Sequence, residues 1–131
     1  KNHRGPQMRT KARDLQNGVL NNLGIFLQRA VKKMDLKWEE IDHTYSHPTT
    51  PKAVKKGAKL ATEIFGEINF LHNDSAETAN TASTTHGVLL EISQNRDYLN
   101  SNETVFMVSF GSGLAIMAMH FNLPEGVEKW S

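Results

Sequence analysis

Apolar residues recur at steps of three and four through the first quarter of the chain. The set is Leu15, Val19, Leu23, Phe26, Leu27, Ala30, Val31 and Met34. Because an α-helix turns once in 3.6 residues, this spacing places them on one helical face. Gly18 and Gly24 weaken the helix by about 1 kcal/mol each without ending it. Residues 1–11 are polar and basic and predict a flexible lead-in, so a single domain is expected over residues 12–131.

A short strand is expected next, and it ends at a histidine. β-Branched and aromatic residues follow Ile41 up to His47, and Pro48 comes directly after it. Proline has no N–H and a fixed φ, so a strand cannot continue through it. Open α/β sheets bind ligands at the carboxyl ends of their strands, where an imidazole can donate a hydrogen bond or move a proton. A purely structural histidine explains the position equally well.

The segment 51–65 predicts a second helix with clear signals at both ends. Thr49 or Thr50 suits the N-cap, Pro51 the first turn, and Gly66 the position just past the end. Its apolar face carries Val54, Ala58, Ala61 and Phe65, and its opposite face carries Lys52, Lys55, Lys56 and Lys59. A lysine stripe of this kind is usually a solvated helix face.

The rest of the chain predicts three strands and one helix. The expected order is a short strand over 67–72, a polar loop over 73–79, a helix starting at Asn80 or Thr81, and strands over 104–110 and 114–121. The segment 104–110 is rich in β-branched and aromatic residues, which is typical of a buried strand, and Gly111, Ser112 and Gly113 end it. Because a tight turn joins the last two strands, we expect an α/β fold with a mixed sheet.

Composition narrows the class of protein. The chain has 131 residues, 38% of them hydrophobic, which suffices for one domain with a buried core. A net charge of +1 gives no indication of nucleic acid or of an anionic membrane as a partner. The chain has no cysteine, which excludes disulfides, thiolate metal sites and a cysteine nucleophile within it. No apolar run approaches the roughly 20 residues of a membrane span, so a cytoplasmic protein is expected.

Three candidate sites follow strand ends: His47, Asn80 and the turn from Gly111 to Gly113. Each has an ordinary explanation, since asparagine is a good N-cap and a Gly-Ser-Gly segment is usually only a turn. Together, two neutral hydrogen-bond donors beside a glycine-rich backbone would suit a developing oxyanion.

In this order and spacing the motifs resemble the C-terminal half of a β-ketoacyl-acyl carrier protein synthase III, a thiolase-fold condensing enzyme. The active-site histidine of that family ends a motif Ile-Asp-x-x-x-x-His, which residues 41–47 match. Its active-site asparagine opens a segment of small residues, which residues 80–85 match. An apolar strand ending in Phe-Gly-x-Gly, followed by a final strand, matches residues 106–121. The resemblance covers the chain from about Val19 to Phe121.

The resemblance implies a decarboxylative Claisen condensation of an acyl thioester with a malonyl thioester. His47 and Asn80 would hydrogen-bond to the malonyl thioester carbonyl and stabilise the enolate as carbon dioxide leaves. The backbone of Gly111, Ser112 and Gly113 would contribute to the acyl oxyanion site, and Phe110 would line the pocket. His47 is expected to be neutral in this role.

The resemblance also implies the partners. The substrates would be thioesters of coenzyme A or of acyl carrier protein, with no further cofactor and no metal. Lys52 matches a basic position that meets the acidic carrier protein, and Lys55, Lys56 and Lys59 extend that face. The nucleophilic cysteine of the family belongs to the N-terminal half. The chain is therefore expected to be a C-terminal domain that works with the N-terminal half of the same enzyme, in a homodimer.

Two departures from the family pattern leave open the primer and the choice between fatty-acid biosynthesis and a polyketide or other secondary-metabolite pathway. The family has Pro-His-Gln-Ala-Asn where this chain has Ser46-His47-Pro48-Thr49-Thr50, and the segment 68–79 is a few residues longer than usual. The alternative function is a catalytically inactive thiolase-fold subunit that binds a partner or carrier protein, and a third is an unrelated α/β binding domain. On its own the chain is expected to expose an apolar face and to self-associate weakly.

Overall fold

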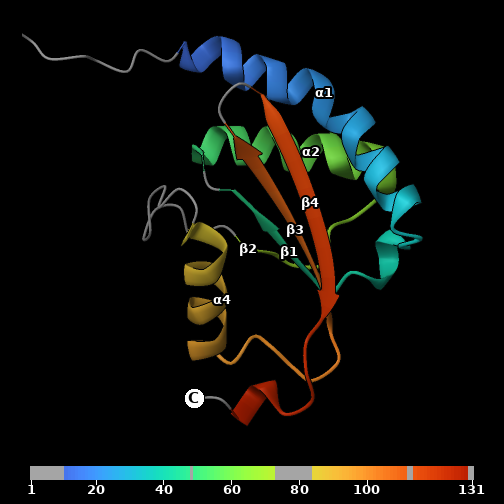
Figure 1. Ribbon diagram of the computed structural model, residues 1–131, viewed down its shortest axis with the longest axis vertical. Helices are drawn as coiled ribbons and strands as arrows, with labels where there is room; N and C mark the ends of the chain where they lie inside the picture. Colours follow the sequence, from blue (N-terminus) through green and yellow to red (C-terminus); the bar gives the residue numbers. More distant parts are fainter. Residues whose placement is uncertain (1–10, 48, 73–83, 112–113, 130–131) are drawn as a thin grey trace, which may run out of the picture.

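The computed structural model describes residues 11–47, 49–72, 84–111 and 114–129, and these form a mixed sheet between two layers of helices (Figure 1). The elements in chain order are α1 (Ala12–Lys33), η1 (Trp38–Glu40), β1 (His43–Ser46), α2 (Pro51–Phe65), β2 (Leu71–His72), α4 (Thr85–Asn95), β3 (Thr104–Gly111), β4 (Ala115–Asn122) and η3 (Val127–Lys129). This order confirms the α/β fold expected from the sequence. Except for Lys11, the expected lead-in lies outside the described residues. None of the helices in the described ranges combines the length and apolar character needed to cross a membrane.

The sheet has the strand order β2-β1-β3-β4. β1 runs parallel to both β2 and β3, and β3 runs antiparallel to β4, so the sheet is mixed as expected. The register between the two central strands pairs His43 with Val105 and Ser46 with Val108. The carboxyl end of β1 therefore lies beside the middle of β3. Both β1 and β3 are inner strands of the sheet, each paired with a neighbour on either side.

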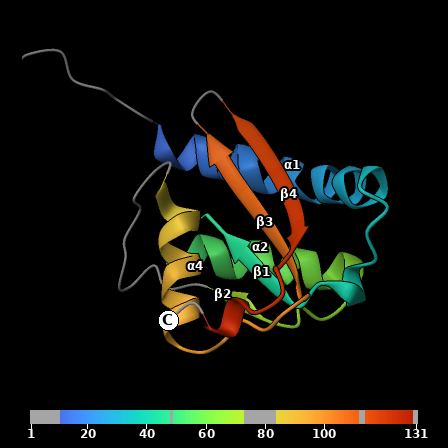
Figure 2. The same cartoon turned by 60° about the horizontal axis from the view of Figure 1, so that its bottom comes forward.

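Alternating side chains of β3 divide the core into two clusters. Phe106 and Val108 pack with α1, α2 and Trp38, whereas Val105 and Met107 pack with Leu89 of α4. Successive residues of a strand point to opposite faces of the sheet, so α4 covers the face opposite α1 and α2. The two views in Figures 1 and 2 agree with this three-layer arrangement.

Helix α2 follows the signals read from the sequence. The side chain of Thr50 accepts a hydrogen bond from the backbone N–H of Ala53 at 3.2 Å, and Pro51 occupies the first turn. Gly66 ends the helix with φ of 98°, a conformation that favours glycine. All four lysines of the predicted stripe are exposed.

The expected strand over 67–72 is mostly wrong, because only Leu71 and His72 form β2. The preceding residues hydrogen-bond to side chains and to the edge of β1 instead. Trp38 Nε1 donates to the carbonyl of Glu67 at 3.3 Å, and Asn69 Nδ2 donates to the carbonyl of Ile41 at 2.6 Å. These bonds hold the segment against the start of β1 without a regular ladder. The third helix is described from Thr85, and its expected start at Asn80 or Thr81 lies outside the described residues.

Candidate active site

His47 lies directly after β1, at its carboxyl end. Its backbone N–H donates to the carbonyl of Val108 at 2.9 Å, which extends the ladder with β3 by one residue. The half-buried imidazole contacts Phe110 edge-on, with ring centroids 6.4 Å apart, and lies 6.5 Å from the ring of His86 on α4. Three elements therefore fix this side chain: β1, β3 and α4.

Burial lowers the pKa of His47 below its ordinary value of 6.5. Desolvation disfavours the charged form of an imidazole, so the neutral ring prevails at neutral pH. In the described part of the chain no carboxylate pairs with His47 to oppose this effect. A neutral imidazole keeps one N–H with which to donate a hydrogen bond.

His86 is a second imidazole of this site, and the sequence reasoning did not single it out. It lies in the first turn of α4, and its Nε2 is 2.5 Å from the hydroxyl oxygen of Ser109 on β3. Its Nδ1 is buried and has no hydrogen-bond partner among the described residues. Burial, and then the nearby His47, lower the pKa of His86. The only sequence signal was a histidine six residues after Asn80, at the start of a helix.

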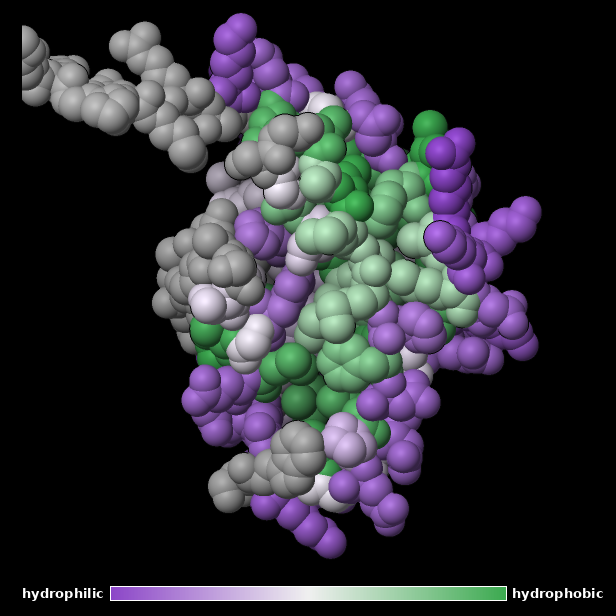
Figure 3. Space-filling model, viewed as in Figure 1, coloured by the Kyte–Doolittle hydropathy of each residue, from purple (hydrophilic) through white to green (hydrophobic). Residues whose placement is uncertain are grey.

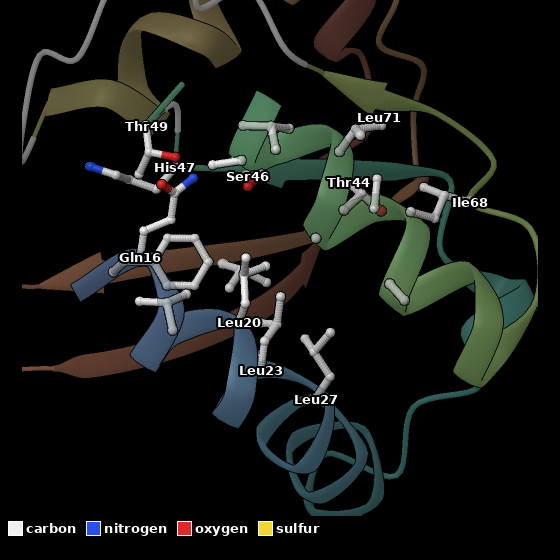
Figure 4. A pocket seen from close by; sticks show the side chains of 18 of the residues that line it. Gln16, Leu20, Leu23, Leu27, Thr44, Ser46, His47, Thr49, Ile68 and Leu71 are labelled. Carbon is white, nitrogen blue, oxygen red and sulfur yellow. The ribbon is translucent and has the colours of Figure 1, made fainter. Parts of the chain in front are cut away.

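A cavity of about 760 Å³ opens beside His47, between the sheet and helices α1 and α2 (Figure 4). Its walls are mostly apolar, and its size falls in the usual range for small-molecule sites, roughly 300–1,000 Å³. Gln16, His47 and Thr49 lie together at one end in this view, and Leu27 lies toward the other. The arrangement can hold a ligand with a polar group at His47 and an apolar part along the sheet.

The structure brings together only part of the predicted site. Phe110 and Gly111, at the end of β3, line the cavity together with His47. Asn80, Ser112 and Gly113 lie outside the described residues, so their positions relative to His47 stay predictions. The lysine stripe begins two residues after Thr50, which also lines the cavity. Lys59 lies 3.9 Å from Glu63, which is a weak exposed ion pair.

A second polar cluster lies on the other face of the sheet, under α4. Nδ1 of His43 lies 3.0 Å from Nε2 of His72, and Nε2 of His43 lies 2.5 Å from a carboxylate oxygen of Glu103. The hydroxyl of Ser93 forms hydrogen bonds with the ring of His72 and with the hydroxyl of Tyr45. Burial raises the pKa of Glu103, but hydrogen bonds from His43 and Asn100 outweigh it and hold the pKa below the ordinary value. Because His43 and Tyr45 point away from the cavity, this cluster stabilises the core and takes no part in the candidate site.

Within the described residues, no group of three or more histidine or carboxylate side chains could hold a metal ion.

No model of a protein family matches the chain, and no curated protein matches it significantly. Solved structures do match it. A 3-oxoacyl-(acyl carrier protein) synthase III from Pseudomonas aeruginosa superposes with a TM-score of 0.75 at 14% identity, covering 93% of this chain and 39% of that one. The priming β-ketosynthase of the R1128 polyketide pathway gives 0.76 at 15% identity, covering 89% and 34%. A 3-oxoacyl-[acyl carrier protein] synthase III from Aquifex aeolicus gives 0.72 at 18% identity, covering 87% and 36%.

These similarities concern the fold. Nearly the whole chain superposes on the synthases, and it spans less than two fifths of their length. At such identities a shared architecture does not establish a shared reaction. The chain therefore has the thiolase-like fold of the 3-oxoacyl-acyl carrier protein synthases III, over about a third of their length.

Proposed function

We propose that this chain is the C-terminal half of a condensing enzyme similar to 3-oxoacyl-acyl carrier protein synthase III. The reaction is a decarboxylative Claisen condensation of an acyl thioester with a malonyl thioester. One observation carries the proposal: a neutral, half-buried imidazole, His47, lies at the carboxyl end of β1 and at the mouth of an apolar cavity.

The proposed reaction needs a hydrogen-bond donor beside the developing enolate, and a neutral imidazole can be that donor. When the malonyl thioester loses carbon dioxide, the electron pair of the broken C–C bond passes to the thioester oxygen as an enolate. An N–H donor already held in place stabilises that charge without reorganisation in the transition state. A neutral His47 donates one such hydrogen bond.

Asn80 is the second donor of the proposal. It precedes α4 by five residues, and the first turn of α4 reaches His47 through His86. The backbone that continues β3 past Phe110 and Gly111 supplies the oxyanion site for the acyl thioester. The described residues next to these two segments, His86 on α4 and Phe110 on β3, both have rings beside that of His47.

The acyl group is held elsewhere in the enzyme. This chain has no cysteine, so the N-terminal half supplies the thiolate that takes the acyl group from coenzyme A and releases the free thiol. The enolate carbon then attacks the acyl carbonyl, the new C–C bond forms, and the cysteine leaves. This chain alone is inactive. The full-length enzyme acts as a cytoplasmic homodimer on thioesters of coenzyme A and of acyl carrier protein, with no further cofactor.

The test is malonyl-thioester decarboxylation by the full-length protein carrying His47→Ala or Asn80→Ala. Each substitution is expected to slow decarboxylation at least tenfold, about 1.4 kcal/mol of barrier. His120→Ala is the matched control, because His120 is exposed on the edge strand β4 and does not line the cavity. If both site variants keep the rate of the control, the catalytic assignment fails. The alternative, an inactive subunit that binds a carrier protein through its lysine face, then becomes the better account.

A further inference from the structure

The imidazole of His47 is held between two rings. Phe110 on β3 and His86 on α4 both contact it edge-on, with ring centroids 6.4 and 6.5 Å away. Crossed planes with centroids about 4.5–7 Å apart are typical of aromatic pairs that orient each other. The backbone N–H of His47 is fixed by the carbonyl of Val108, but this bond leaves the side-chain torsions free. Among the described residues, the two rings therefore restrict where the N–H of the imidazole points.

Ser109 on β3 anchors one of these rings. Its hydroxyl oxygen lies 2.5 Å from Nε2 of His86, while Nδ1 of His86 is buried without a hydrogen-bond partner among the described residues. The ring of His86 cannot turn about its torsions without breaking this bond. Ser109 lies between Val108 and Phe110, so three successive residues of one strand act on His47. Val108 and Phe110 contact it directly, and Ser109 acts through His86.

The two imidazoles can lie side by side because both are neutral. Burial lowers the pKa of His47, and burial followed by the charge of His47 lowers the pKa of His86. At neutral pH neither ring is charged, so they do not repel each other. An apolar ring at position 86 could fill the same space, but the hydroxyl of Ser109 could not hold it by a hydrogen bond.

We propose that His86 is a positioning residue. Anchored by the hydroxyl of Ser109, its ring keeps the imidazole of His47 in the orientation from which it donates to the developing enolate. The role in decarboxylation rests on the proposed function, whereas the control of His47 by Ser109 and His86 does not. An error of about 1 Å in the place of a reacting group can slow a reaction about a hundredfold. Loss of the anchor should therefore lower kcat for decarboxylation and leave KM for the malonyl thioester nearly unchanged.

Two substitutions of Ser109 in the full-length protein provide the test. Valine and threonine have the same branched shape, and only threonine keeps a hydroxyl. Ser109→Val is expected to lower kcat at least about tenfold with KM within about twofold, whereas Ser109→Thr should keep kcat within about threefold of the unsubstituted protein. Equal rates in the two variants overturn the proposal.

A second variant removes the same hydrogen bond from the other side. His86→Phe keeps a ring on α4 but has no nitrogen to meet Ser109, so it should lower kcat as Ser109→Val does. The double variant should be no slower than the slower single variant, because both lose one shared bond. Effects that multiply in the double variant overturn the anchoring of His86 by Ser109.

Ser93→Ala separates positioning from a general loosening of α4. The hydroxyl of Ser93 also ties α4 to the sheet, through Tyr45 of β1, but Ser93 lies in the last turn of the helix and does not line the cavity. This substitution should lower stability and leave kcat unchanged at a temperature where the protein is folded. A loss of kcat equal to that of Ser109→Val would show that any weakening of α4 slows the reaction, and would overturn the specific role of His86.

The ring of His47 can also be observed without turnover. Its Cε1–H signal in an NMR spectrum of full-length protein with isotope-labelled histidine is assigned by its loss in His47→Gln. This signal should move in Ser109→Val and stay in place in Ser109→Thr and Ser93→Ala, because neighbouring rings shift it only at short range. An unmoved signal in Ser109→Val would overturn the positioning of His47. A signal that moves while His47→Ala keeps its decarboxylation rate would support the positioning and reject the proposed function.

Discussion

At the scale of single residues, the two neutral histidines of the site make folding sensitive to acid. Burial lowers the pKa of both His47 and His86 below 6.5 in the folded chain. As the pH falls, these histidines are therefore protonated at a higher pH in the unfolded chain than in the folded one. Their contribution is complete above pH 6.5 and is lost as the pH falls through that value and below the folded-state pKa. We expect a lower free energy of unfolding at about pH 5 than at about pH 8, the range in which histidine titrates.

Urea denaturation at the two pH values checks this, with His47→Gln/His86→Gln as the comparison. The double variant lacks both titrating groups, so its stability should change less between the two pH values than that of the unsubstituted protein. The other histidines are present in both proteins and cancel in the difference. An equal change in both proteins would show that His47 and His86 do not contribute.

The buried cluster under α4 provides a second residue-scale prediction. Ser93 is fully buried, accepts a hydrogen bond from the hydroxyl of Tyr45 at 2.9 Å, and donates to the carbonyl of Leu89 at 2.7 Å. Ser93→Ala should lower the free energy of unfolding by about 1–3 kcal/mol, because it removes a partner from buried polar groups. In a cycle with Tyr45→Phe the two losses should be less than additive, since the variants share one bond. Strict additivity in chemical denaturation would contradict the coupling.

The sequence could predict His47 at this scale but not His86. His47 has a local signal, because a strand of β-branched and aromatic residues ends at a proline. The contact of His86 with Ser109 joins residues 23 positions apart, and it exists only once α4 lies across β3. The cluster of His43, His72 and Glu103 is likewise invisible before folding, because its members come from three separate segments.

At the scale of elements, the predictions that rest on local sequence signals are confirmed, and those that depend on contacts between distant segments are not. Helices α1 and α2 follow from periodicity and from capping residues, which are local properties. The segment 67–70 resembles a strand in composition, yet tertiary hydrogen bonds from Trp38 and Asn69 give it a different path. Short apolar segments are decided by their neighbours, so their boundaries are the least predictable part of the fold.

The exposed lysine face of α2 is the element to test for carrier-protein docking. In the proposed enzyme, Lys52→Glu/Lys55→Glu should weaken the attraction to an acidic carrier protein and raise KM for a carrier-bound malonyl thioester at least tenfold. KM for malonyl-coenzyme A should change less than threefold, because that substrate has no protein surface to dock. Lys32→Glu/Lys33→Glu, at the exposed end of α1, is the matched control. Equal effects on the two substrates would argue against docking through α2.

At the scale of the whole molecule, the uncovered face of β4 is the feature to test. Met117 and Met119 are 63% and 53% exposed, and Figure 3 shows apolar side chains gathered on the face where β4 lies. Met119 pairs with Met107, which is buried beneath α4, so these methionines continue the α4 side of the sheet beyond the reach of that helix. An exposed apolar edge strand favours association with another chain.

In the proposed enzyme the N-terminal half covers this face, and the isolated chain has only copies of itself to cover it. Sedimentation velocity of the isolated chain should therefore show association that grows with concentration, and Met117→Lys/Met119→Lys should abolish it. Ile25→Lys, at an exposed apolar residue of α1, should not. In the full-length protein the same methionine substitutions should lower stability, because they bury two lysines against the other half. A chain that stays monomeric at every concentration, or a full-length protein indifferent to both lysines, would show that β4 faces solvent in the working enzyme.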